Sequence, residues 1–227
     1  MKIKCLMIDH DDTAVNSTEL INYPCYVEFM KKYYSDKPIL TIEMWYEVLW
    51  NIGLIEYYKT QVGLTDEMLQ FEHSYWKNYI SEKPRPPFFD GFIDLLKRFK
   101  EQGGIVAVVS FSSKEVILKH YSEATNGEFI PDEIFGYQHG HPELSKPNTY
   151  PIEQLIKKYG FKPEEMVMVD DMKEGLIMAS RVKGVKSIGV QYSEGHGKTI
   201  DKMKEYCDFI AYKVSDIAEF IGLTSEE

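Results

Sequence analysis

The stretch that decides the fold lies near the start of the chain, where residues 3–13 read IKCLMIDHDDT. Its apolar half, residues 3–8, is typical of a buried strand. Asp9 and Asp11 follow directly, so both carboxylates can converge on one point beyond the strand end, while alternation directs the intervening His10 away from them. Crowded like charges are costly unless a cation or hydrogen-bond donors compensate them. The pattern therefore indicates a functional site rather than a packing role.

Two further apolar runs end in polar side chains in the same way. Residues 105–109 lead to Ser110, and residues 166–169 lead to Asp170 and Asp171. Helical and strand patterns alternate through this part of the chain, which is typical of a parallel sheet with crossover helices on both faces. Ligands of such sheets bind beyond the carboxyl ends of the strands. We therefore predict an α/β fold, a doubly wound parallel sheet of the Rossmann-like type, with these side chains on one rim.

The carboxy-terminal part continues the alternation of strands and helices. Residue composition predicts strands over 187–190 and 208–214. Serine is favoured at the N-cap of a helix, so we expect a last helix capped by Ser215.

A long segment of different character separates the first two strands. Residues 19–83 show helical periodicity throughout and contain all three tryptophans. The proline-rich stretch 83–87 cannot continue a helix. We therefore expect an α/β core, residues 1–15 and 88–227, and an inserted helical domain, residues 16–87.

Composition and charge narrow the functional class. The 227 residues are 44% hydrophobic and 27% charged, as in soluble globular proteins. The net charge is −10 and no dense Lys/Arg cluster occurs, so we expect no nucleic-acid partner. No apolar run approaches the roughly 18–20 residues that span a bilayer, and no signal-peptide pattern is present. We therefore expect no membrane partner and a cytoplasmic location. The three widely spaced cysteines predict no disulfide framework.

Four motifs, in this order, resemble those of the haloacid dehalogenase superfamily of phosphohydrolases. They are Asp9-x-Asp11-x-Thr13, Ser110, Lys146-Pro147, and Asp170-Asp171 followed by Gly175. The resemblance extends over the expected core and is nearest to the phosphoglycolate phosphatase and β-phosphoglucomutase-like members. It implies that residues 16–87 form a helical cap, which would close over the core and exclude water from the phosphoryl site.

The resemblance implies a catalytic role for four residues. Asp9 would be the nucleophile that forms an aspartyl-phosphate. Asp11 would protonate the leaving group and later activate water. Ser110 would hydrogen-bond the transferring phosphoryl group, and Lys146 would offset the negative charge of the nucleophile and the phosphate.

The resemblance also implies a Mg²⁺ ion, held by Asp9, Asp170, Asp171 and the backbone carbonyl of Asp11. Oxygen ligands of this kind suit a hard cation. Two positions depart from the family pattern, because Asp12 stands where glycine is usual and the acidic pair replaces the commoner Gly-Asp. Of the pair we favour Asp171 as the direct ligand, with Asp170 in support. Asp12 would either make a structural hydrogen bond or change the charge of the site.

The function expected is that of a Mg²⁺-dependent phosphatase acting on a small phosphorylated metabolite, such as phosphoglycolate or a sugar phosphate. Asp11 favours phosphoryl transfer over dehalogenation, since a halide leaves without a proton. Two alternatives remain open: a phosphomutase using the same site, and a catalytically silent binding or regulatory protein of the same fold. The chain is expected to be a monomer or a homodimer.

Overall fold

The computed structural model describes residues 2–193 and 195–223, which divide into two compact units. Within the described residues, the first unit contains 2–15, 87–192 and 202–223. The second contains 16–86, 193 and 195–201. No helix in the described part of the chain combines the length and apolar character needed to cross a bilayer.

The first unit is built on a six-stranded parallel sheet with the order β3-β2-β1-β4-β5-β6. The strands are β1 (Cys5–Ile8), β2 (Ile105–Val109), β3 (Glu133–Phe135), β4 (Met166–Asp170), β5 (Lys186–Val190) and β6 (Phe209–Ala211). Strand order changes direction around β1, which pairs with β2 on one side and β4 on the other. A topological switch point of this kind leaves a crevice beyond the carboxyl ends of the strands. The predicted doubly wound α/β fold is confirmed.

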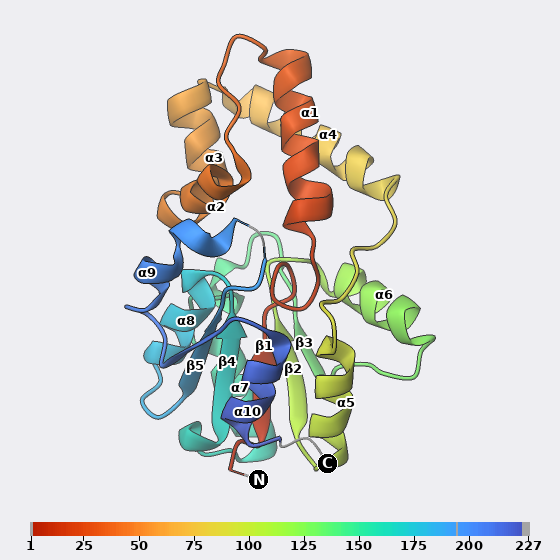
Figure 1. Cartoon of the computed structure of the whole chain (residues 1–227), viewed down its shortest axis with the longest axis vertical. Coiled ribbons are helices and arrows are strands. Elements are labelled where there is room, and N and C mark those ends of the chain that lie inside the picture. The colour runs from red at the N-terminus through yellow and green to blue at the C-terminus, as the bar shows by residue number, and fades with distance from the viewer. Residues whose placement is uncertain (1, 194, 224–227) are drawn as a thin grey trace. The chain divides into compact units, whose positions relative to one another are not determined.

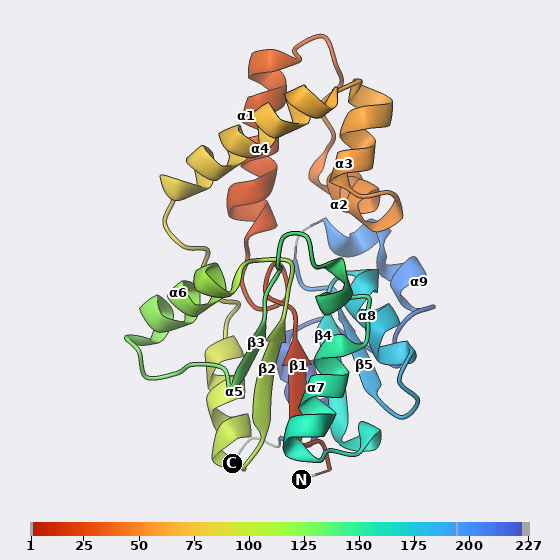
Figure 2. The ribbon, with the colours of Figure 1, turned by 180° about the vertical axis from the view of Figure 1, so that it is seen from behind.

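Alternating side chains of β1, β2 and β4 supply two hydrophobic cores. Leu6 and Ile8 of β1 belong to the core on one face of the sheet, whereas Cys5 and Met7 belong to the core on the other. The first core is completed by α5 (Phe92–Glu101), α6 (Lys114–Thr125) and α10 (Val214–Ile221), and the second by α7 (Tyr150–Tyr159) and α8 (Lys173–Ser180). Figures 1 and 2 show α10 and α7 on opposite faces of this sheet. Both faces are covered, so the loops at the strand ends are where a polar site can form.

Three features of this unit differ from what the sequence predicted. The short edge strand β3 was not predicted, because three half-buried residues carry too little pattern. The last strand covers only Phe209–Ala211, and the last helix is not capped by Ser215. Instead, the Asp216 carboxylate accepts the backbone N–H of Tyr212 at 2.8 Å and of Lys213 at 3.1 Å. The helix therefore begins at Val214 with Lys213 at its N-cap, two residues before the predicted cap Ser215.

The second unit is helical, and its aromatic residues form its own core. Its helices are α1 (Tyr23–Tyr33), α2 (Ile42–Asn51), α3 (Leu54–Tyr57) and α4 (Asp66–Ser81), and the short α9 (Ile200–Met203) begins here. Tyr26, Phe29 and Trp45 are buried in one cluster. A segment distant in sequence also belongs to this unit, because the His196 ring packs edge-on against Tyr46 with centroids 4.5 Å apart. Nothing in the sequence pattern indicated that residues following β5 would join the helical unit.

Candidate active site

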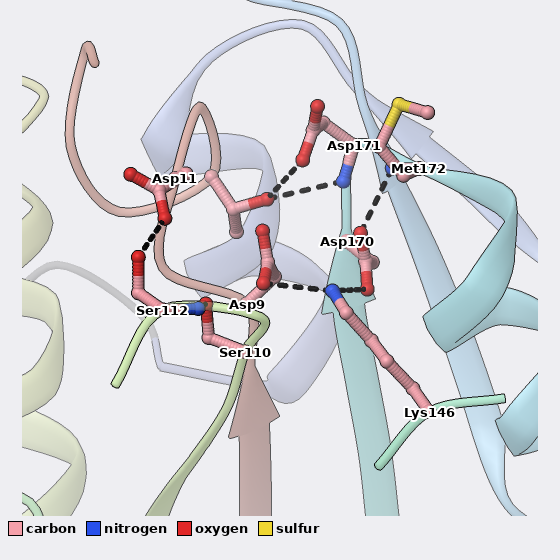
Figure 3. A network of polar contacts seen from close by, with 9 residues as sticks. Asp9, Asp11, Ser110, Ser112, Lys146, Asp170, Asp171 and Met172 are labelled. Carbon is pink, nitrogen blue, oxygen red and sulfur yellow. Dashed lines mark hydrogen bonds and ion pairs between the residues drawn. The ribbon is translucent and has the colours of Figure 1, made fainter. Parts of the chain in front are cut away.

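Three of the residues singled out from the sequence meet beyond the carboxyl ends of β1 and β4 (Figure 3). The Asp9 backbone N–H donates to the Val169 carbonyl at 2.9 Å, which continues the β1–β4 pairing by one residue and places Asp9 beside Asp170. The Lys146 ammonium donates to Asp9 Oδ1 and to Asp170 Oδ2, both at 2.7 Å. All three side chains are buried. Lys146, which comes from the loop before α7, therefore bridges the two strand ends.

Burial and charge act in opposite directions on these groups. Burial disfavours a charged lysine, but the Asp170 and Asp9 carboxylates outweigh it and raise the pKa of Lys146 above its ordinary value. Burial raises the pKa of Asp170 well above its usual range, and Lys146 opposes that change. Burial also raises the pKa of Asp171, and the Asp9 charge adds to that rise. Burial thus favours the neutral form of both aspartates, and nearby positive charge favours their carboxylate form.

Asp171 is fixed by Thr13, the last residue of the first motif. The Thr13 hydroxyl donates to Asp171 Oδ1 at 3.1 Å and accepts the Asp171 backbone N–H at 3.0 Å. Asp170 in turn accepts the backbone N–H of Met172 on Oδ1 at 2.8 Å. The Asp171 carboxylate is therefore held by the segment that follows β1, and the Asp170 carboxylate by the loop between β4 and α8.

Gly175 is required by the position of Asp170. A Cβ atom at residue 175 would lie 1.9 Å from Asp170 Oδ2 and 2.8 Å from the Met168 methyl carbon. No side chain is tolerated at such a distance, so the first turn of α8 can approach Asp170 only through glycine.

Gly175→Ala should therefore displace Asp170 and weaken its contact with Lys146. We expect catalytic turnover to fall by at least about tenfold, since a displacement near 1 Å in such a site is costly, and stability to fall by about 1–3 kcal/mol from overpacking. Steady-state kinetics and chemical denaturation measure both. Gly197→Ala is the matched control, because Gly197 is exposed and nothing lies within 4 Å of its added Cβ. Full activity and stability of Gly175→Ala would contradict the requirement.

Asp11 lies on the other side of the site, within reach of the loop that follows β2 (Figure 3). Asp11 Oδ2 accepts a hydrogen bond of 2.6 Å from the Ser112 hydroxyl. Ser110 is buried, and its Oγ accepts the Ser112 backbone N–H at 3.1 Å. Ser112 is not the N-cap of the helix that follows, since Ser113 occupies that position. Its contact with Asp11 joins segments 101 residues apart, which no local pattern could reveal.

Asp12 and His10 occupy special positions next to the two aspartates. Asp12 has φ of +58°, the left-handed conformation for which glycine is usual and which aspartate tolerates better than most residues. His10 is fully buried and contacts His120, with Nε2 and Nδ1 2.9 Å apart, so its side chain turns away from Asp9 as expected. Burial is the main cause that lowers the pKa of His10.

The residues present fit a divalent metal ion. Carboxylate oxygens of Asp9, Asp170 and Asp171 lie within 4.8 Å of one another, and all three residues are buried. The Lys146 ammonium pairs with Asp9 and Asp170, and Asp171 adds a third carboxylate to the group. Hard divalent cations favour oxygen ligands of this kind. The Asp11 side chain is not in this group.

Comparisons with known proteins agree with one another. A family model described as haloacid dehalogenase-like hydrolase matches residues 6–190. The chain is 28% identical over 109 residues to a phosphoglycolate phosphatase of Vibrio parahaemolyticus, a match that spans 48% of this chain and only 41% of that one. It is 21% identical over 234 residues to the pyrophosphatase PpaX of Bacillus mycoides, with 98% of each chain covered. Among solved structures, a predicted phosphoglycolate phosphatase from Haemophilus somnus has a TM-score of 0.74 at 22% identity, covering 97% of this chain and 98% of that one.

Proposed function

Because the chain belongs to the family of haloacid dehalogenase-like hydrolases, we propose that it is a Mg²⁺-dependent phosphatase that acts on a small phosphorylated metabolite. The observation that carries this proposal is the placement of Asp9, which is buried, held by Lys146 and flanked by two further buried carboxylates. A carboxylate fixed in this way at a strand end can attack phosphorus as a nucleophile.

In the first step, an Asp9 carboxylate oxygen attacks the phosphorus atom and the bond from phosphorus to the leaving oxygen breaks. Asp11 gives its proton to that oxygen, so the product leaves as a neutral alcohol and Asp9 carries the phosphoryl group. In the second step, Asp11 takes a proton from water as the water oxygen attacks phosphorus. The bond from Asp9 to phosphorus breaks, inorganic phosphate leaves, and both aspartates return to their starting states.

Mg²⁺ would be held by Asp9, Asp171 and the backbone carbonyl of Asp11, with Asp170 in support. When bound, it would supply positive charge that relieves the repulsion between the anionic nucleophile and the anionic phosphate. Ser110, whose Oγ already accepts a backbone N–H, retains its own O–H to donate to the phosphoryl group. Lys146 adds a fixed positive charge beside the nucleophile.

We propose that the second unit serves as the cap. Its residues 16–86 are inserted between β1 and β2, directly after the motif that contains Asp9 and Asp11. The cap would exclude water and choose the leaving group. The names of the two curated relatives suggest phosphoglycolate and inorganic pyrophosphate as first substrates to test.

The test is phosphate release from p-nitrophenyl phosphate, phosphoglycolate, pyrophosphate and a set of sugar phosphates, each with Mg²⁺ and with EDTA. We expect release that depends on Mg²⁺ and falls by at least about 100-fold in EDTA, since the metal supplies several kcal/mol of charge stabilisation. Isomeric phosphates among the products, without net phosphate release, would favour the phosphomutase instead. Mg²⁺ binding without turnover of any substrate would favour a silent binding protein.

Calorimetry with Mg²⁺ separates the two aspartate roles. Asp171→Ala should lose more Mg²⁺ affinity than Asp11→Asn, because Asp11 would contribute only a backbone carbonyl and its side chain lies outside the carboxylate group. Equal losses of affinity in both variants would contradict this division.

A further inference from the structure

The Asp11 carboxylate is oriented by one hydrogen bond. Ser112 Oγ donates to Asp11 Oδ2 at 2.6 Å (Figure 3), a length typical of a hydroxyl donating to a charged oxygen. Among the described residues, this is the only hydrogen bond that the carboxylate accepts. Asp11 is partly exposed, in contrast to the buried Asp9. Its orientation therefore depends on Ser112 rather than on surrounding packing.

Ser112 is itself held at its backbone by two neighbours. Its N–H donates to Ser110 Oγ at 3.1 Å, and its carbonyl accepts the Tyr137 N–H at 3.0 Å. Gly136 lets the segment after β3 come this close, since a Cβ there would lie 2.5 Å from Lys114 N and 2.9 Å from the Ser112 carbonyl oxygen. The hydroxyl of Ser112 thus projects toward Asp11 from a backbone fixed on both sides.

Helix capping does not account for this serine. The N-cap of α6 is Ser113, whose Oγ accepts the Val116 N–H at 3.4 Å. The Ser112 hydroxyl is committed to Asp11. The adjacent Ser112 and Ser113 therefore have separate roles. Ser113→Ala is the matched control for a change at Ser112.

We propose that Ser112 is a positioning residue that fixes the Asp11 carboxyl group so that Oδ1 is the atom that carries the catalytic proton. The inference rests on the proposed function and adds a residue to it. Oδ2 accepts from Ser112 whether Asp11 is an acid or a carboxylate, so one orientation serves both steps. In the first step the proton on Oδ1 passes to the leaving oxygen as the bond from that oxygen to phosphorus breaks. In the second, Oδ1 takes a proton from the attacking water.

The test compares two substrates that differ in their need for a proton. An alkyl phosphate releases an alkoxide unless an acid protonates it, whereas p-nitrophenyl phosphate releases a stable anion. For Ser112→Ala, kcat/KM, which reports the steps through release of the alcohol or phenol, should fall by roughly 10–100-fold with the alkyl phosphate. With p-nitrophenyl phosphate it should fall by less than about threefold. The wild type and Ser113→Ala should share one ratio of these two values.

A second measurement distinguishes positioning from general damage to the loop. In an Asp11→Asn background, Ser112→Ala should change the ratio no further, because residues that act through one another are not additive. Equal losses with both substrates, an unchanged alkyl phosphate rate, or a full additional loss in the Asp11→Asn background would each overturn the role of Ser112. Absence of wild-type turnover with either substrate would instead contradict the proposed phosphatase.

Discussion

Replacing Asp9 by Asn should abolish turnover while leaving the protein folded. An amide cannot attack phosphorus as a carboxylate does, and loss of a nucleophile commonly costs far more than loss of an auxiliary group. We expect phosphate release to fall by at least about 1,000-fold. The fold should persist, because Asn fills the same volume and removes one of three crowded carboxylates. Phosphate release and circular dichroism, measured on the same preparation, check both parts.

The matched control is Asp132→Asn, which also breaks an aspartate–lysine pair. Asp132 pairs with Lys100 at 2.8 Å and accepts the Val106 N–H. Val106 lies at the amino end of β2, whereas the site lies beyond the carboxyl ends of the strands. This variant should lose some stability and keep its activity. Near-normal activity of Asp9→Asn would show that another group is the nucleophile.

The covalent step can be observed directly. Acid quenching during turnover should trap a phosphorylated wild-type chain that intact-mass spectrometry detects, and peptide mapping should place the phosphoryl group on Asp9. A phosphatase that activates water for direct attack would show no such species. Trapping of the phosphoryl group elsewhere would contradict the nucleophile assignment while preserving the phosphatase.

The fold and much of the site could be predicted because they depend on local pattern. Apolar runs that end at Asp9, Ser110 and Asp170 specify buried strands, and parallel strands bring their carboxyl ends to one edge. Lys146 is different, since it follows no strand and only its resemblance to a family motif marked it. The structure brings its ammonium to 2.7 Å from two carboxylates.

Features that depend on distant contacts were not predictable. Ser112 reaches Asp11 only after β1 and β2 have paired, and serine before a helix more often signals a cap. The same holds for His196, which belongs to the helical unit and packs its ring against Tyr46. Such pairings leave no periodicity in the chain, so pattern alone assigns them to loops.

The second large effect is expected from Lys146→Met, measured in EDTA. Methionine keeps most of the apolar stem of lysine but leaves Asp9 and Asp170 buried without their shared cation. Breaking a buried pair from one side commonly costs about 3–5 kcal/mol, because the remaining charge stays desolvated. Chemical denaturation at neutral pH should show a loss of this size. Lys186→Met is the control, since its pair with Asp208 is half-exposed and should contribute little.

The pH dependence of that loss tests its cause. Burial already raises the pKa of Asp170 in the wild type, and Lys146 opposes the rise, so removing Lys146 should raise that pKa further. The folded variant would then bind more protons than its unfolded chain above about pH 4, where free aspartates ionise, and its stability must fall as pH increases. The deficit relative to the wild type should therefore be small in acid and grow toward neutral pH. Asp170→Asn added to Lys146→Met should recover part of it, because one uncompensated carboxylate is gone. A deficit that is equal at all pH values and unaffected by Asp170→Asn would mean that Lys146 stabilises the fold by packing rather than by charge.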